Sequence, residues 1–454
     1  MTVQIHRSGG RLLPAAAVVL ITVLAAVAVR LAFVNEVNSD YRAFLSPWYD
    51  ALAAGGGFRA IGQEIGNYDP PYLYLLAAAT YLPLPKIVAI KLVSIAFDVL
   101  LAAFAGLIVR RRFSVRMAVL AFAVVLSAPT VLINSGYWGQ CDSIYAAFCL
   151  GSLYFLLRGR AWWACVFFGL ALSFKLQAAF FLPALLIVMV VNRRRLLALL
   201  AIPATFIVML LPAALAGRSW RSLLMVYPNQ VTTGGNAGGF GRAGGGFGAG
   251  GAGFGAGGVG PGAASSGGLG TWTQNGPTMF QWVGGSVAWL VLGLAIAALL
   301  IVGMGALCWR RRPLTEPQIV LLVTATVLVV PFFLPQMHER YFYLADVMTI
   351  VAAFYLRRFW PVALVVSACS LMSYFPFLWR TTPVPLPLVA FGEFLAVIAT
   401  LAVFVHVLTA PDNRWLRGSP RVVDPATRAV AGADPMAVIP STSGRPAGRP
   451  PSPA

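Results

Sequence analysis

Long apolar runs fill most of this 454-residue sequence, and short clusters of arginine separate them. The run at residues 12–34 alone is long enough to cross the hydrocarbon core of a bilayer as a helix. With 59% hydrophobic and only 10% charged residues, the chain has too little polar surface for a water-soluble globule. The pattern predicts an all-α polytopic membrane protein. Its formal net charge of +19 therefore points to membrane lipids as partners and not to nucleic acid.

The arginine clusters orient the predicted helices, because cytoplasmic loops carry an excess of Lys and Arg. Consecutive clusters must be separated by an even number of crossings, which gives about twelve transmembrane helices with both termini in the cytoplasm. The clusters are Arg7/Arg11, Arg110–Arg112 with Arg116, Arg158/Arg160, Arg193–Arg195, Arg310–Arg312 and Arg357/Arg358. The apolar runs are 12–34, 87–109, 117–134, 142–157, 161–174, 178–192, 196–214, 284–307, 317–335, 341–356, 359–376 and 385–408. We expect an integral protein of the inner or plasma membrane.

Two long loops fall outside the cytoplasm in this topology, residues 35–86 and 215–283. The first contains an apolar segment at 70–85 that we interpret as an interfacial or re-entrant helix. A further crossing there would place the cluster Arg110–Arg112 outside the cytoplasm. The second contains a glycine-rich insertion at 233–270, which is too poor in apolar side chains to form a core and is predicted to be flexible. We therefore expect a membrane domain over 1–409 and a disordered cytoplasmic tail over 410–454.

The unusual polar stretches all fall on the extracytoplasmic side of this topology. They are SDYRAFLSPWYD at 39–50, NYDPPYLYLL at 67–76, SGYWGQCDS at 135–143, SFKLQ at 173–177, TQNGPTMFQW at 273–282 and QMHERYFY at 336–343. A polar group at membrane depth costs several kcal/mol unless it is paired or hydrated, so such groups usually mark a site. The sequence predicts a water-accessible cavity at the extracytoplasmic face.

The residue types in these stretches suit the transfer of a phosphate-linked sugar. Carboxylates and aromatic faces suit sugars, and cations beside them suit a phosphate leaving group. The candidate residues are the carboxylates Asp40, Asp69, Asp142 and Glu339, the cations Lys175, His338 and Arg340, the aromatic residues Trp48 and Trp138, and the amides Gln140, Gln177 and Asn275. We expect no cofactor, and this chemistry requires no metal, although Asp40 and Asp142 could share a divalent ion.

Five of these motifs, in this order, carry a family resemblance: SDYRAFLSPW, NYDPPYLYL, NSGYWGQCDS, FKLQ and HERYF. Over about residues 12–376 the chain resembles GT-C glycosyltransferases, and within them dolichyl-phosphate-glucose glucosyltransferases of N-glycan assembly and bacterial GPI-mannosyltransferase-like proteins. The resemblance implies an inverting hexosyltransferase that uses a polyprenyl-phosphate sugar and a lipid-linked or other glycan acceptor outside the cytoplasm. It implies that Asp40 is the catalytic base and that Lys175, His338 and Arg340 lie beside the donor phosphate. Asp142 replaces a more usual amide, and HER replaces HEK.

Simpler explanations exist for several of these residues. Asp40 could cap the helix that begins at Tyr41, and Asp69 could make an Asx turn before two prolines. The tryptophans could belong to an interfacial belt, and Lys175 could extend to the lipid headgroups. Arg30, within the first run, could pair with a carboxylate of the cavity. For the whole chain, the alternatives are a transporter or lipid flippase, which would predict polar groups at mid-membrane, and a scaffold without chemistry.

Overall fold

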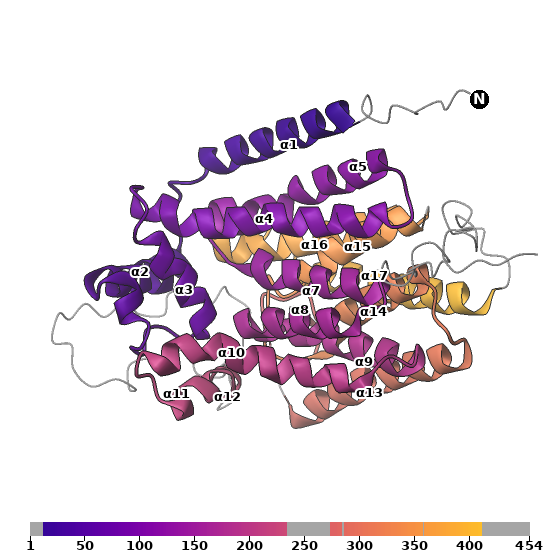
Figure 1. Cartoon of the computed structure of the whole chain (residues 1–454). Helices are drawn as coiled ribbons and strands as arrows, with labels where there is room; N and C mark the ends of the chain where they lie inside the picture. The colour runs from indigo at the N-terminus through magenta and orange to yellow at the C-terminus, as the bar shows by residue number, and fades with distance from the viewer. Residues whose placement is uncertain (1–11, 234–272, 284–285, 357, 411–454) are drawn as a thin grey trace, which may run out of the picture. The chain divides into compact units, whose positions relative to one another are not determined.

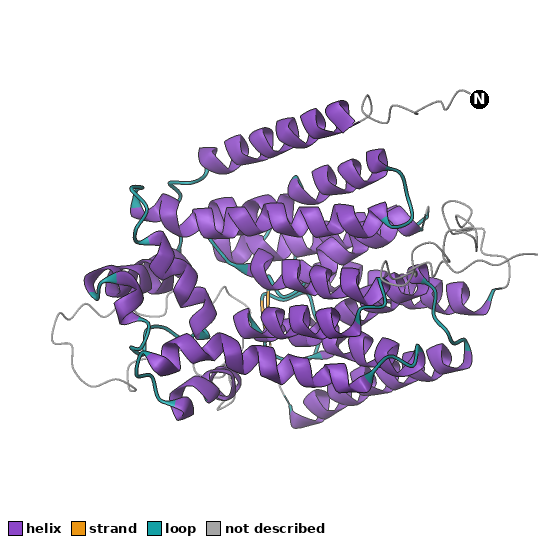
Figure 2. Cartoon of the chain, in the orientation of Figure 1, coloured by secondary structure: helices purple, strands orange, loops and turns teal. Residues whose placement is uncertain are grey.

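The computed structural model describes residues 12–233, 273–283, 286–356 and 358–410, and this part of the chain is mostly helical (Figure 2). Most of the glycine-rich insertion and all but the first residue of the predicted tail lie outside the described residues, so those two predictions are not addressed by it. The all-α fold class is confirmed.

Seventeen α-helices, with short 3-10 and π-helical turns and two very short strands, make up the described part of the chain (Figure 1). The α-helices are α1 (Leu12–Ala32), α2 (Ser46–Ala54), α3 (Pro70–Ala79), α4 (Lys86–Arg110), α5 (Val115–Leu126), α6 (Pro129–Leu132), α7 (Asp142–Leu157), α8 (Ala161–Phe174), α9 (Leu182–Val191), α10 (Ala201–Leu215), α11 (Trp220–Leu224), α12 (Val226–Thr233), α13 (Val287–Arg310), α14 (Glu316–Phe333), α15 (Tyr343–Tyr355), α16 (Trp360–Leu378) and α17 (Leu386–Thr409). The turns are η2 (Tyr41–Leu45), η3 (Gly57–Ala60), η4 (Ile133–Trp138), η5 (Leu176–Phe181), η6 (Leu196–Leu200) and η7 (Met279–Gln281), and the strands are β1 (Thr273–Gln274) and β2 (Met337–His338).

Six described helices are long and apolar enough to cross a membrane: α4, α10 extended by η6, α13, α14, α16 and α17. A seventh candidate is the pair formed by α5 and the segment Pro129–Trp138, which is bent by 52°. Five shorter apolar helices cover Ala16–Ala32, Asp142–Leu157, Ala161–Phe174, Leu176–Val191 and Tyr343–Tyr355. Each of the twelve predicted apolar runs coincides with one of these helices or with the bent pair, whereas the number of actual crossings stays a prediction.

Burial separates the central helices from the peripheral ones. In α14, 89% of the most apolar window is buried inside the protein, and every residue of α15 is buried. In α13 the corresponding share is only 17%, and large side chains such as Leu299 and Val302 are exposed. In a water-soluble protein such a surface would be an aggregation site, but a lipid bilayer solvates it. The core of the fold is therefore the layer containing α14 and α15, and α13 faces lipid.

The segments α2, η3 and α3 connect α1 to α4 and gather at one end of the long helices, where α11 and α12 also lie (Figure 1). The ten residues of α3 begin with two prolines, which fit the first turn of a helix because no backbone N–H is needed there. At this length α3 cannot span the hydrocarbon core. This agrees with the prediction that residues 70–85 do not form a crossing.

Candidate functional site

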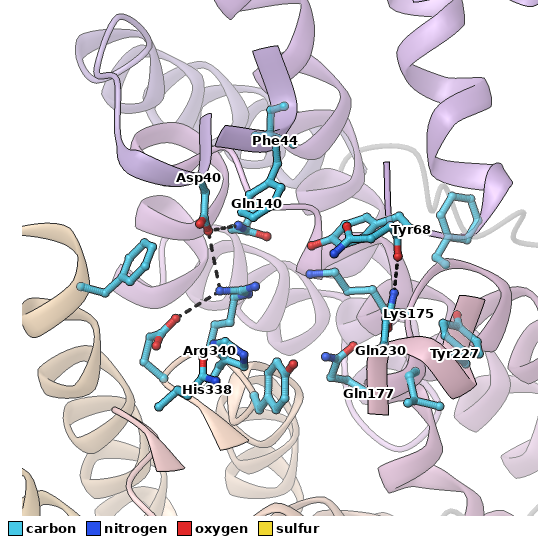
Figure 3. Close-up of a pocket in the computed structure, with 18 of the residues that line it drawn as sticks. Asp40, Phe44, Tyr68, Gln140, Lys175, Gln177, Tyr227, Gln230, His338 and Arg340 are labelled. Atoms are coloured by element: carbon cyan, nitrogen blue, oxygen red, sulfur yellow. Dashed lines mark hydrogen bonds and ion pairs between the residues drawn. The ribbon is translucent and has the colours of Figure 1, made fainter. Parts of the chain in front are cut away.

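A cavity of about 380 Å³ lies where the polar motifs converge (Figure 3). Its walls come from η2 and α2, the segment before α3, the turn before α7, η5, α12, and the paired strands β1 and β2. The predicted site residues that line it are Asp40, Trp48, Gln140, Lys175, Gln177, Asn275, His338, Glu339 and Arg340. Asp69, Trp138 and Asp142 do not line it. Segments more than 200 residues apart in sequence thus contribute to one polar cavity.

Asp40 precedes the π-helical turn η2, and its carboxylate points to the cavity and not to the helix. Its Oδ2 accepts hydrogen bonds from Trp138 Nε1 at 2.9 Å and from Gln140 Nε2 at 2.6 Å. The side chain of Asp40 makes no capping bond, and Asn38 Oδ1 accepts the Tyr41 amide instead. The capping alternative is therefore wrong. Within the described residues, Oδ1 of Asp40 has no hydrogen bond and is left to meet a ligand.

The two donors to Asp40 are presented by an irregular turn between α5 and α7. The helical path is broken at Ala128, after α5, because the residue before a proline is disfavoured in the helical region. The turn η4 follows and ends at Gly139, whose φ of 80° suits glycine. The backbone N–H of Gln140 donates to the backbone carbonyl oxygen of Asn134 at 2.9 Å, which closes the turn. Within it, a Cβ on Gly136 would meet Arg30 Cγ at 2.9 Å, so only glycine fits there without displacement.

Four charged side chains form a buried cluster beside Asp40. Lys175 Nζ donates to Asp142 Oδ1 at 2.6 Å, and Asn134 Nδ2 donates to Asp142 Oδ2 at 2.8 Å. Arg340 lies between the carboxylates: Nη1 is 3.1 Å from Glu339 Oε1 and 3.7 Å from Asp40 Oδ2, and Nε is 3.9 Å from Asp142 Oδ2. The cluster brings Asp40, Lys175 and Arg340 to one cavity, and Asp142 lies directly behind it.

The protonation states of the cluster follow from burial and from neighbouring charges. For Lys175, burial favours the neutral amine, but the adjacent Asp142 carboxylate outweighs it and raises the pKa, so the amine stays charged. For His338, burial and then the positive charges of Arg340 and Lys175 lower the pKa to about 3. His338 is therefore neutral near pH 7, and its place beside the donor phosphate stays a prediction. Burial raises the pKa of Glu339 to about 7 against the opposing effect of Arg340.

The two predicted aromatic platforms differ in position. Trp48 lines the cavity, and its ring meets that of Tyr68 edge-on at 5.1 Å. Trp138 is fully buried behind the cavity, where it stacks on Phe377 at 5.0 Å and has the Arg340 guanidinium 5.3 Å from its ring centre. A cation at this distance over an indole face is attracted by the ring quadrupole. Trp138 is thus neither a belt residue nor a wall of the cavity, and it supports both Asp40 and Arg340.

Asp69 lies at the start of α3, outside the cavity wall, and its side chain is fully buried. It makes no capping bond to α3. Tyr227 faces it, but the Tyr227 hydroxyl donates to the Leu172 carbonyl oxygen, so no hydrogen bond reaches the Asp69 carboxylate within the described residues. Burial raises the pKa of Asp69 to about 7, and the positive charge of Arg218 opposes this effect. Its neighbours in the motif, Asn67 and Tyr68, are the residues that line the cavity.

Several lining residues were not predicted from the sequence: Phe44, Asn67, Tyr68, Tyr227, Gln230 and Gln274. Asn67 and Tyr68 belong to the NYDPP motif, which drew attention to Asp69 instead. Tyr227 and Gln230 lie in α12, just before the glycine-rich insertion, where no polar contrast marks them. Among the described residues, no group of three or more His, Cys, Asp or Glu side chains is arranged to hold a metal ion. Metal dependence stays a prediction.

A second buried ion pair lies away from the cavity. Arg30 Nη2 is 2.8 Å from Asp98 Oδ2, and Arg30 Nε donates to Asp98 at 2.9 Å and to Ser135 Oγ at 3.1 Å. The expectation that Arg30 pairs with a cavity carboxylate is therefore wrong. Its partner belongs to α4, and the pair joins α1, α4 and η4.

Comparison with known proteins identifies the family. No curated protein matches the chain. A family model described as glycosyltransferase family 87 matches residues 67–335. The matched region includes Lys175, Gln177 and Gln230, and it excludes Asp40 and the segment from His338 to Arg340. It spans more than half of the sequence, and the chain therefore belongs to glycosyltransferase family 87.

Proposed function

We propose that the protein transfers a hexose, mannose or glucose, from a polyprenyl-phosphate donor to a hydroxyl of a lipid-linked or other glycan acceptor. Family membership supports a membrane glycosyltransferase. The observation that carries the finer proposal is one cavity that combines an incompletely hydrogen-bonded carboxylate, Asp40, with two cations, Lys175 and Arg340. A base and a phosphate-binding pair at one cavity are what direct displacement of a phosphate by a hydroxyl requires.

In this mechanism Asp40 is the general base. Its Oδ2 is held by Trp138 and Gln140, which fixes the carboxylate and leaves Oδ1 to accept the proton of the acceptor hydroxyl. The hydroxyl oxygen attacks the anomeric carbon from the side opposite the phosphate, and the bond between that carbon and the phosphate oxygen breaks. The electron pair of this bond leaves with the phosphate, so the configuration at the anomeric carbon is inverted.

Lys175 and Arg340 would stabilise the departing phosphate. Lys175 has one short contact with Asp142, and Arg340 reaches Asp40 and Asp142 only at 3.7 and 3.9 Å. Hydrogen bonds from ionised donors to phosphate are shorter and stronger than these long contacts, so phosphate can replace them. His338 is neutral and would contribute a hydrogen bond without a charge.

The lipid part of the donor suits a protein embedded in a bilayer. The polyprenyl chain would lie among the apolar helices while the phosphate enters the polar cavity. We place this cavity on the extracytoplasmic side of the inner or plasma membrane, with both termini in the cytoplasm, on the positive-inside pattern of the arginine clusters. The resemblance of the five motifs to dolichyl-phosphate-glucose glucosyltransferases and GPI-mannosyltransferase-like proteins supports the choice of donor.

The test uses purified protein in lipid nanodiscs with polyprenyl phosphates that carry labelled glucose or mannose. The expected result is consumption of one of these donors, with inverted product when an acceptor glycolipid is supplied, and the same rate in the presence of a chelator. Donors that are neither bound nor consumed would overturn the proposal. A labelled donor that crosses the membrane of a proteoliposome intact would instead establish the transporter or flippase.

A further inference from the structure

The cavity has two chemically different ends. One end is charged and contains Asp40, Arg340 and their partners. At the other end Gln177, Gln230, Tyr68 and Tyr227 gather, and Lys175 lies between the two groups (Figure 3). Asn67, which accepts a hydrogen bond from Gln230, belongs to this second group. We call Asn67, Gln177 and Gln230 the amide end.

The amide end is assembled from three segments that are distant in sequence. Gln230 Nε2 donates to the Asn67 backbone oxygen at 2.5 Å, which ties α12 to the segment before α3. Gln177 comes from η5, two residues after Lys175, and its amide meets the Tyr341 hydroxyl. The Asn67 side-chain oxygen is buried and has no hydrogen bond within the described residues. Asn67 itself lines the cavity, together with Gln177 and Gln230.

The chemistry of the amide end differs from that of a phosphate site. An amide side chain offers both a donor and an acceptor, as a sugar hydroxyl does, whereas a phosphate oxygen at neutral pH mainly accepts. The rings of Tyr68 and Tyr227 flank the amides. The Lys175 ammonium is directed to Asp142, and the amide end itself contains no charged side chain. The amide end therefore has the composition expected for an uncharged polyol.

We propose that the amide end binds the hydroxyl groups of the transferred sugar and selects an uncharged hexose over a uronic acid or an amino sugar. This inference rests on the proposed function, because it assumes that Lys175 meets the donor phosphate. The anomeric carbon is one oxygen away from that phosphate, so the sugar ring must lie in the space next to Lys175, where Gln177 and Gln230 are. A charged substituent there would lose its hydration, and none of Asn67, Gln177 and Gln230 carries an opposite charge.

The test introduces a carboxylate at the amide end by the substitution Gln230→Glu. Transfer is measured from polyprenyl phosphates that carry glucose, glucosamine or glucuronic acid, or mannose, mannosamine or mannuronic acid where the wild-type protein uses mannose. For the wild-type protein we expect kcat/KM to be highest with the uncharged hexose. In Gln230→Glu the ratio of kcat/KM for glucosamine to that for glucose should rise about tenfold or more, because the new carboxylate gives the ammonium a charged partner. The matched control is Gln63→Glu, an exposed glutamine outside the cavity, which should leave the ratio unchanged.

A second variant protects the test against a folding defect. Gln177→Glu places the same charge at the amide end from η5, and thermal melts identify the variants that fold. Gln230→Leu should weaken binding of the glucose donor while binding of the polyprenyl phosphate without sugar stays at the wild-type level. An unchanged donor ratio in folded Gln230→Glu and Gln177→Glu would overturn the amide end as the sugar subsite. If the wild-type protein uses neither the glucose donor nor the mannose donor, the proposed function fails instead.

Discussion

Two groups of buried charges in this protein contain the same kinds of side chain and differ in how well the charges are matched. In the pair of Arg30 and Asp98, which we call the closed pair, the side chains are 1% and 0% exposed and the ion-pair distance is 2.8 Å. Arg30 also donates to Ser135 and to the carbonyl oxygens of Ala26 and Leu126. All three nitrogens of this guanidinium are used within the protein.

The group around Arg340, which we call the open cluster, is different. The Arg340 side chain is 13% exposed and has one short contact, to Glu339 at 3.1 Å. Its Nε has no hydrogen bond within the described residues, and its contacts with Asp40 and Asp142 are long. A guanidinium whose nitrogens all have partners within the protein keeps no donor for a ligand, whereas Arg340 does. The comparison teaches that burial alone does not separate the two arginines, but the hydrogen bonding of their guanidinium groups does.

The largest expected effect is on activity, at the open cluster. Asp40→Asn keeps an oxygen that can accept from Trp138 and Gln140 but cannot take a proton, so transfer should fall by about two to four orders of magnitude. The thermal melt should stay close to that of the wild type. Transfer at the wild-type rate would show that Asp40 is not the base, and Glu339, the other carboxylate that lines the cavity, would be tested next.

The next effect is on stability, at the closed pair. Arg30→Met leaves the Asp98 carboxylate buried without its cation, which should lower the free energy of unfolding by about 3–5 kcal/mol. Adding Asp98→Leu should recover part of that loss. Chemical unfolding in detergent measures both. If Arg30→Met leaves the free energy of unfolding unchanged, the closed pair does not stabilise the fold and does not differ from the open cluster in this respect.

A smaller effect is expected on donor binding when a cation is removed from the open cluster. Lys175→Met alone would strand Asp142, so it is combined with Asp142→Asn. The double variant should fold and bind the polyprenyl-phosphate donor about 10- to 100-fold more weakly, because one ionised donor to the phosphate is lost. Asp142→Asn alone serves as the control and should retain donor binding. Equal affinity in the two variants would exclude Lys175 from the phosphate site.

The open cluster should also make stability depend on pH. Burial, with Arg340 opposing it, raises the pKa of Glu339 from 4.5 to about 7, so the folded state holds this proton more tightly than the unfolded state. The stabilisation is therefore complete below about pH 4.5 and is lost as pH rises to about 7. The melting temperature should fall over this interval, and Glu339→Gln should flatten the curve relative to wild type. An identical slope in the variant would contradict the assignment.

The smallest effect is expected at the exposed ion pair of Lys86 and Asp50, which serves as a reference for the closed pair and the open cluster. Lys86 Nζ lies 2.8 Å from Asp50 Oδ2, as close as the closed pair, but the side chains are 35% and 60% exposed. Water and salt screen such a pair, so Asp50→Asn should change the free energy of unfolding by about 0–1 kcal/mol. Chemical unfolding checks this. A loss as large as that of Arg30→Met would mean that distance, and not burial, sets the effect.

The sequence predicted the helices better than it predicted their side-chain partners. An apolar run that spans a bilayer forms a helix because lipid offers its backbone N–H and C=O groups no other hydrogen-bond partner. The positions of the helices could therefore be read from the apolar runs in the sequence. The motifs also led to Asp40, Gln140, Lys175 and Arg340. They did not show which residue of NYDPP reaches the cavity, because the prolines interrupt the helical period there and Tyr68, not Asp69, points inward.

Partners across helices were beyond the sequence for a different reason. Arg30 and Asp98 are 68 residues apart, and nothing in the spacing of two helices indicates which faces meet. Gln230 was missed because α12 has no apolar stripe against which a polar residue would contrast. In both cases the missing information is tertiary packing.

Gly136 is a position at which we expect no other residue to be tolerated. A side chain at this position would press on Arg30, and η4 carries both this glycine and Trp138, which holds Asp40. A saturation library scored for activity should therefore reject every substitution at 136, although the residue binds nothing itself. Such a map would show constraint that extends from the proposed base, Asp40, through the closed pair to α1. Helix α1 thus limits which substitutions the turn beside Asp40 can accept.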